Sequence, residues 1–214
     1  DNLCRCYCFS HWIIIRFYFY HVKSQIKILL DLSNLIVYNL QVRNKIANVL
    51  DLEFNNPETT KDIIEIGLAM VDLDSLTIVK KVSIPVLLPE GMEVNPFVSH
   101  LTGWTTAKLL KQGVPLETAC ERIKEKYGSK NRLLVVDDEN ETSLFKELNP
   151  FGSDIVNVSS LYKVVRKDFN SDKSLEFMLE SFGLKFEGKQ HRASDDAYNI
   201  AKLFITMMKM MQEN

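Results

Sequence analysis

The spacing of apolar residues becomes regular from Lys45 onward and predicts strands in the first part of this region. Three apolar runs, at residues 47–54, 63–72 and 77–86, have the length and composition of strands. Only a short polar connection at residues 72–75 separates the second run from the third, which indicates a hairpin. The chain therefore opens its regular part with consecutive strands.

Beyond residue 86, short apolar strands alternate with amphipathic helices. The segment that follows Pro85 is predicted to be a loop through Pro96 and then a turn at residues 99–105. Gly128 and Gly183 each follow a predicted helix, as expected of residues that end helices. The predicted later strands are 133–136 and 155–158, and the predicted helices are 105–112, 115–127, 140–148, 159–166, 174–182 and 193–211. This order predicts an α/β fold, with a mixed sheet flanked by helices.

Residues 1–44 differ in character from the rest of the chain. The apolar run at 9–20 is interrupted by His11 and Arg16, and it is shorter than the about 20 apolar residues that span a bilayer. Residues 24–42 fit one amphipathic helix. We expect an N-terminal extension over 1–44, either a loosely docked appendage or a membrane-surface segment, and one domain over 45–214.

Composition narrows the class of protein without identifying a function. The chain has 214 residues, of which 46% are apolar and 25% charged, as is ordinary for a soluble globular protein. Its net charge of −2 provides no overall basic surface for nucleic acid, so any such surface must be local. Three of the four cysteines crowd residues 4–8, which is not a disulfide framework. An intracellular, cytoplasmic location is therefore expected.

The first strand carries two carboxylates within an apolar run. Asp51 and Glu53 are separated by one residue, so on a strand their side chains project from the same face. Burying two like charges is costly unless a cation neutralises them, which favours a divalent metal site. The alternative is a solvated edge strand with two acids on its wet face.

The start of the last helix brings a second group of candidate residues. His191 lies just before the predicted helix and Asp196 more than one turn later, so both side chains can face a common point. The apolar face of this helix places Asp196 near the sheet and Asp195 away from it. Acids in a first helical turn also complement the helix dipole, which accounts well for Asp195 but not for a cationic His191.

A third acidic group follows the short strand at 133–136. The sequence after Val136 is Asp-Asp-Glu-Asn-Glu, with four acids in five positions. One of these acids is a candidate further ligand, and the alternative is the acidic, solvated start of a helix.

Together, these groups resemble the DEDDh exonucleases, the DnaQ-like and RNase T-like 3′–5′ exonucleases with an RNase H-like fold. The similarity covers about residues 46–206. Its motifs are Asp51-x-Glu53, Ile64-Glu65-Ile66-Gly67, Leu101-Thr102-Gly103-Trp104-Thr105 and His191-Arg192-Ala193-x-Asp195-Asp196. The branch that trims RNA is the most similar. At the second motif, alignment on Phe145 places Glu141 where the family has Asp.

The resemblance implies a metal-dependent 3′–5′ exonuclease. Two divalent ions, Mg²⁺ or Mn²⁺, would be held by Asp51, Glu53, Asp196 and Glu141, with Asp137 or Asp138 as substitutes for the last. His191 would take the proton from the attacking water. Because Glu replaces Asp at position 141, the alternative is a catalytically impaired, exonuclease-like protein that binds nucleic acid.

The resemblance also implies where the substrate would bind. The partner would be the 3′ end of single-stranded nucleic acid, with RNA favoured over DNA, and hydrolysis would release nucleoside 5′-monophosphates. Trp104 would stack on the terminal base, although a core-edge aromatic is the equally weighted alternative. The implied substrate-binding residues are Phe54, Leu101, Thr102, Trp104 and Arg192, the last of which would contact phosphate.

Overall fold

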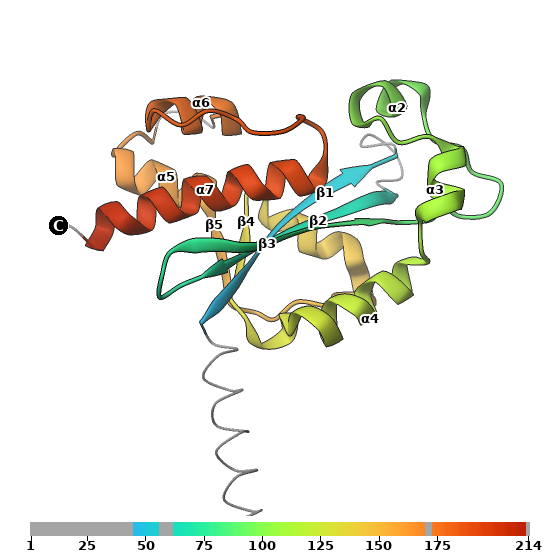
Figure 1. The fold of residues 1–214 in the computed structure, drawn as a ribbon, viewed down its shortest axis with the longest axis horizontal. Coiled ribbons are helices and arrows are strands. Elements are labelled where there is room, and N and C mark those ends of the chain that lie inside the picture. The colour runs from blue at the N-terminus through green and yellow to red at the C-terminus, as the bar shows by residue number, and fades with distance from the viewer. Residues whose placement is uncertain (1–44, 56–61, 170–172, 213–214) are drawn as a thin grey trace, which may run out of the picture. The chain divides into compact units, whose positions relative to one another are not determined.

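The computed structural model describes residues 45–55, 62–169 and 173–212 (Figure 1). The expected extension over residues 1–44, including the amphipathic helix at 24–42, lies outside these residues. Within the described ranges, no helix combines the length and apolar character needed to cross a membrane. Cys120 is buried as a free thiol. The expected intracellular, cytoplasmic location stays a prediction.

Five strands form one mixed sheet in the order β3-β2-β1-β4-β5. The first three strands pair antiparallel, and β4 and β5 add in parallel to β1. This arrangement confirms the predicted mixed sheet. The strands are β1 (Ile46–Phe54), β2 (Ile63–Asp72), β3 (Thr77–Pro85), β4 (Leu134–Val136) and β5 (Ile155–Asn157).

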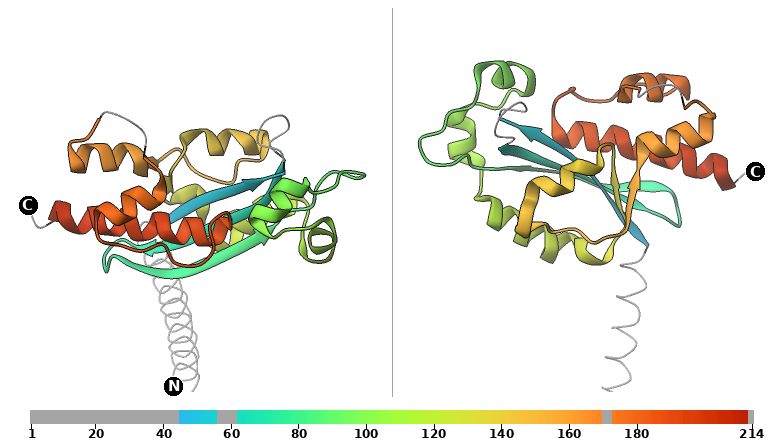
Figure 2. Two further views of the ribbon diagram at one scale, coloured as in Figure 1. Left: turned by 90° about the horizontal axis from the view of Figure 1, so that it is seen from above. Right: turned by 180° about the vertical axis from the view of Figure 1, so that it is seen from behind.

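Helices cover both faces of the sheet. One face packs against α5 (Val158–Arg166), α6 (Leu175–Ser181) and the long α7 (Ala193–Gln212), and α7 crosses β1 and β2 (Figure 1). The opposite face packs against α4 (Leu116–Tyr127) and the 3₁₀ helix η2 (Glu139–Leu148). Figure 2 shows the two layers from above and from behind.

The alternation of β1 determines which side chains each layer receives. Ala47 and Val49 lie in the core beneath α7, whereas Leu50 and Leu52 lie in the core beneath α4. Side chains two residues apart on a strand share a face. Asp51 and Glu53 therefore continue the row of Ala47 and Val49 and face the helix layer that contains α7.

Two segments differ from the sequence prediction. Residues 96–102, predicted as loop and turn, form helix α2 (Pro96–Thr102), because Asn95 caps its start and Pro96 occupies the first helical position. Gly103, with φ of 77°, ends it in the left-handed conformation. The predicted α-helix at 140–148 is instead the 3₁₀ helix η2, which is interrupted at Lys146, where φ is 52°.

The remaining helices agree with the predicted ranges. Helix α3 (Thr106–Gln112) begins at the Thr105 side chain, which accepts a hydrogen bond from the Lys108 amide. Helix α4 ends at Gly128 in the left-handed conformation and is followed by the short 3₁₀ helix η1 (Ser129–Asn131). Together with α2, α3 lies beyond the ends of the central strands (Figure 1).

Candidate functional site

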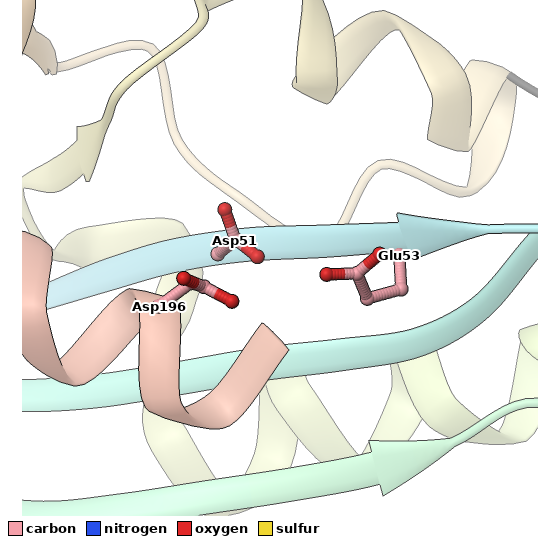
Figure 3. A group of neighbouring side chains, drawn as sticks. All are labelled: Asp51, Glu53 and Asp196. Atoms are coloured by element: carbon pink, nitrogen blue, oxygen red, sulfur yellow. The ribbon is translucent and has the colours of Figure 1, made fainter. Parts of the chain in front are cut away.

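Three carboxylates converge between the central strand and the last helix. Asp51 and Glu53 come from β1, and Asp196 comes from the first turns of α7 (Figure 3). One oxygen from each side chain lies within 4.8 Å of those of the other two. We call these three residues the carboxylate cluster. Its close spacing agrees with the predicted convergence of the first and last motifs.

The carboxylate cluster is unfavourable when all its members are charged. Burial is the largest influence on the pKa of Asp51, which lies well above its usual range, and the nearby charges of Glu141 and Asp196 raise it further. Burial and the Asp196 charge raise the pKa of Glu53 to about 8. Burial also raises the pKa of Asp196 to about 6. Either protons or a cation must therefore neutralise the cluster.

Gly67 allows α7 to approach the sheet closely enough to complete the cluster. It lies opposite Asp51 in the β1–β2 register. A β-carbon at this position would lie 2.0 Å from the carbonyl group of Ala193, the first residue of α7. The backbone N–H of Arg192 donates to the Asp196 carboxylate at 3.0 Å, which orients that side chain at the helix start.

Replacing Gly67 with alanine is expected to push α7 away from β2. The clash is with backbone rather than with a flexible side chain, so overpacking should cost about 1–3 kcal/mol of unfolding free energy. The melting temperature should fall by about 2–4 °C for each kcal/mol. Thermal denaturation would measure this loss.

Gly183→Ala is the matched comparison. Its φ is 71°, but nothing lies within 4 Å of the position of an added β-carbon. This variant therefore reports backbone strain alone, and it should leave metal binding unchanged. In Gly67→Ala, by contrast, displacement of α7 moves Asp196 and should weaken metal binding. Equal metal affinity in Gly67→Ala and the wild-type protein would contradict the role assigned to the close packing of α7 on the sheet.

Glu141 is the acid of the second motif that acts most strongly on the cluster. Its side chain is buried, and its Oε2 atom has no hydrogen-bond partner. Its charge has a larger effect on the pKa of Asp51 than any other charge does. By contrast, the Asp137 carboxylate accepts a 2.5 Å hydrogen bond from Ser159, and Asp138 is exposed. Glu141 lies outside the group of three whose oxygen atoms are within 4.8 Å of one another.

His191 occupies an exposed turn directly before α7. Its φ of 59° is in the left-handed region, which is uncommon for a residue other than glycine. Asp195 organises this turn: its carboxylate accepts the Lys189 amide at 2.8 Å and pairs with Lys81 of β3. Asp195 thus contributes to the architecture of the turn, while the adjacent Asp196 joins the cluster.

Two of the predicted substrate-binding residues are engaged inside the protein. Thr102 is 1% exposed, and its hydroxyl donates to the Val98 carbonyl and accepts the Trp104 amide. Trp104 is 4% exposed, and its indole N–H donates to Glu65 at 2.7 Å. The alternative of a core-edge aromatic describes the position of Trp104, because the buried ring offers no free face to a base. Phe54 and Leu101 are half-buried.

Arg192 and Glu65 form an ion pair that was not anticipated from the sequence. The Arg192 Nε atom lies 3.1 Å from Glu65 Oε2, so the guanidinium predicted to contact phosphate has a protein partner. Glu65 is fully buried on β2, directly opposite Glu53. A single acid in the apolar run of 63–71 was the available signal, but strand register alone reveals its neighbours.

Carboxylates in the middle of a mixed sheet, with another from the helix that crosses it, agree with the arrangement expected of an RNase H-like nuclease. Residues 49–204 match the family model RNase_T, described as Exonuclease. The chain belongs to this exonuclease family, which confirms the DEDDh 3′–5′ exonuclease resemblance and the RNase H-like fold.

Individual relatives agree with this assignment. Human 3′-5′ exoribonuclease 1 is 26% identical over an alignment of 172 residues, which covers 73% of this chain and 49% of that protein. The chain thus spans about half the length of this curated relative.

Solved structures show the same fold at low sequence identity. One is the structure of a 3′-exonuclease in 3′-end specific recognition of a histone mRNA stem-loop. Its TM-score is 0.68 at 20% sequence identity, and the match covers 80% of this chain and 83% of that chain. The nuclease domain of 3′hExo, a DEDDh family member bound to rAMP, has a TM-score of 0.66 at 24% identity, covering 80% and 94%.

The pKa shifts predict how pH changes the stability of the metal-free protein. The folded pKa of Glu53 is about 8 against an ordinary 4.5, so between these values the folded state binds more protons than the unfolded state. Unfolding free energy should therefore fall as pH rises through this window. A divalent ion needs the ionised carboxylates, so Mn²⁺ should raise the melting temperature more at pH 8 than at pH 5.

Calorimetry with EDTA or Mn²⁺ at the two pH values would measure this effect. Glu53→Gln is the matched control, since it removes this titration and should flatten the pH dependence. A wild-type protein whose metal-free stability relative to Glu53→Gln rises from pH 5 to pH 8 would contradict the assignment.

Proposed function

We propose that this chain is a metal-dependent 3′–5′ exonuclease that hydrolyses phosphodiester bonds at the 3′ ends of single-stranded nucleic acid, RNA in preference to DNA. It would release nucleoside 5′-monophosphates. The observation that carries the proposal is the convergence of Asp51, Glu53 and Asp196, with one oxygen of each within 4.8 Å of the others. The human exoribonuclease relative supports RNA as the substrate class.

The donor set fits divalent metal ions. All candidate ligand atoms are carboxylate oxygens, which suit Mg²⁺ and Mn²⁺. The unpartnered Oε2 atom of buried Glu141 and the raised pKa values of the cluster both indicate missing positive charge. Asp51, Glu53, Asp196 and Glu141 would hold the ions. When bound, two such ions would supply an activated water and stabilise the leaving oxygen.

The chain's own residues would position and deprotonate the reacting groups. The exposed imidazole of His191 would accept the proton of the attacking water, because an imidazole changes charge near neutral pH. The turn held by Asp195 would keep His191 near the start of α7. The half-buried Phe54 and Leu101 would contact the terminal nucleotide.

A cleavage ladder tests the proposal directly. The protein would be incubated with matched single-stranded RNA and DNA labelled at the 5′ end, with Mg²⁺ or Mn²⁺. We expect progressive shortening from the 3′ end, faster on RNA, and no shortening in EDTA. Activity unaffected by EDTA would remove the metal-dependent mechanism, and internal cleavage would remove the exonuclease assignment.

A second candidate function is the binding of 3′ ends without efficient cleavage. Glu141 favours it, because its side chain is one methylene longer than the family's Asp and it lies outside the group of three with 4.8 Å spacing. Glu141 also belongs to the irregular 3₁₀ helix η2. Under this alternative, the wild-type protein would bind labelled RNA in Mg²⁺ but leave it intact.

Variants of Glu141 separate the two candidates. If the chain is an active nuclease, Glu141→Gln should lower the cleavage rate at least about tenfold, since it removes one charge from the ligand set. Glu141→Asp should then retain activity. If the wild-type protein is inactive and Glu141→Asp gains cleavage, the longer side chain is the cause of impaired catalysis. Cleavage by Glu141→Gln at the wild-type rate would exclude Glu141 from the metal site.

A further inference from the structure

Glu65 is a buried carboxylate with four hydrogen-bond contacts and no contact with solvent. Its side chain is 0% exposed. It accepts from the Trp104 indole at 2.7 Å and from the Ser83 hydroxyl at 2.6 Å. The Arg192 guanidinium donates to it through two nitrogens, at 3.1 and 3.4 Å. Such a group is expensive to bury unless it is paired, so these contacts hold both Glu65 and Arg192 in defined positions.

The strand register places Glu65 next to the carboxylate cluster. Glu65 and Glu53 are directly opposed in the antiparallel β1–β2 pair. Opposed side chains in such a pair share a face, with Cβ atoms about 4.5–5.5 Å apart. Glu53 is affected by both groups: the Glu65 charge raises the pKa of Glu53, and the Arg192 guanidinium lowers it.

The Arg192 side chain is 29% exposed and contacts both Trp104 and Glu65. Its guanidinium carbon lies 4.7 Å from the centre of the Trp104 ring, a cation–π distance, while Glu65 binds its nitrogens. Glu53 lies opposite Glu65 in the strand register, and the Arg192 charge already acts on it, so a guanidinium released from Glu65 would have Glu53 as a neighbouring carboxylate with which to pair. An arginine paired with Glu53 would occupy the oxygen atoms that a metal ion needs.

We propose that Glu65 is a positioning residue, which holds Arg192 away from Glu53 and so keeps Glu53 available to a divalent ion. This inference rests on the proposed metal-dependent function. It also changes the role of Arg192: the sequence predicted a contact with phosphate, whereas here its guanidinium is paired with Glu65 of β2.

Calorimetric titration with Mn²⁺ tests the inference without measuring activity. Glu65→Gln keeps the shape of the side chain but releases Arg192, so Mn²⁺ affinity should fall about tenfold or more, as is typical when a group that orients a metal ligand is changed. In the double variant Glu65→Gln/Arg192→Gln, the competing cation is absent, and affinity should return to within about twofold of wild type. Ser83→Ala removes only a neutral donor to Glu65 and should bind Mn²⁺ as the wild type does.

The outcomes distinguish this inference from the function on which it rests. Unchanged affinity in Glu65→Gln, or a double variant no better than the single one, would overturn the inference while leaving the metal site intact. A wild-type protein that binds no Mn²⁺ would overturn both. If thermal denaturation shows that Glu65→Gln does not fold, Arg192→Gln alone decides: equal or tighter Mn²⁺ binding supports the inference, and weaker binding overturns it.

Discussion

His191→Ala is expected to slow 3′-end trimming by about 10²–10⁴-fold, the usual contribution of a general base. The side chain is exposed in the turn before α7, so its removal leaves the core packing unchanged. The melting temperature should therefore stay near the wild-type value. Single-turnover cleavage of a labelled RNA oligonucleotide, with a thermal melt of the same preparation, measures both quantities.

His100→Ala is the matched control for this prediction. His100 is an exposed histidine on α2, outside the proposed site. It should trim RNA at the wild-type rate. Near-wild-type trimming by His191→Ala would refute the proton-accepting role, and a lower melting temperature for His191→Ala alone would point to a structural role.

Asp51→Asn is expected to abolish cleavage and, at the same time, to stabilise the metal-free protein. Loss of a central ligand should slow cleavage by at least about 1000-fold, because metal ions supply several kcal/mol of charge stabilisation in the transition state. Burial and neighbouring acids raise the pKa of Asp51, so a neutral amide removes an unfavourable charge at pH 8. In EDTA, the unfolding free energy should rise by about 1–3 kcal/mol.

Both halves of this prediction can be measured on one protein. Cleavage in Mn²⁺ and thermal melting in EDTA would be compared with Asp74→Asn, which changes an exposed acid that pairs with Lys45. Asp74→Asn should cleave like the wild type. An Asp51→Asn variant that loses stability in EDTA as well as activity would show that the carboxylate has a structural role in the fold rather than serving the metal site.

The placement of the first two ligands follows from local periodicity. A strand alternates faces every residue, so the sequence around Asp51 sufficed to predict that Asp51 and Glu53 share a face. The structure shows that they continue the row of Val49 beneath α7. Most helix bounds were equally local, because capping residues such as Gly128 act on their own chain neighbours.

Helix α2 has local sequence signals that also fit a loop, so the prediction of a loop at its start is wrong. The sequence prediction ends a loop at Pro96, whereas proline is also favoured in the first turn of a helix. The Asn95 side chain caps that helix. The backbone N–H of Asn95 donates to the side-chain oxygen of Asn55 at 2.7 Å, which attaches the start of α2 to the end of β1. That contact spans 40 residues and has no signal in either segment alone.

By itself, the sequence determined the order of the strands and of most helices, the exonuclease family and the four carboxylates proposed as ligands, because these depend on periodicity and on motifs within short segments. Only the tertiary structure decided that Gly67 allows the start of α7 to approach the sheet, that the charge of Glu141 acts on Asp51 more strongly than that of Asp137, and that Glu65 pairs with Arg192. These contacts join residues that are distant in the chain, and they depend on strand register and backbone packing, which short-range patterns do not encode.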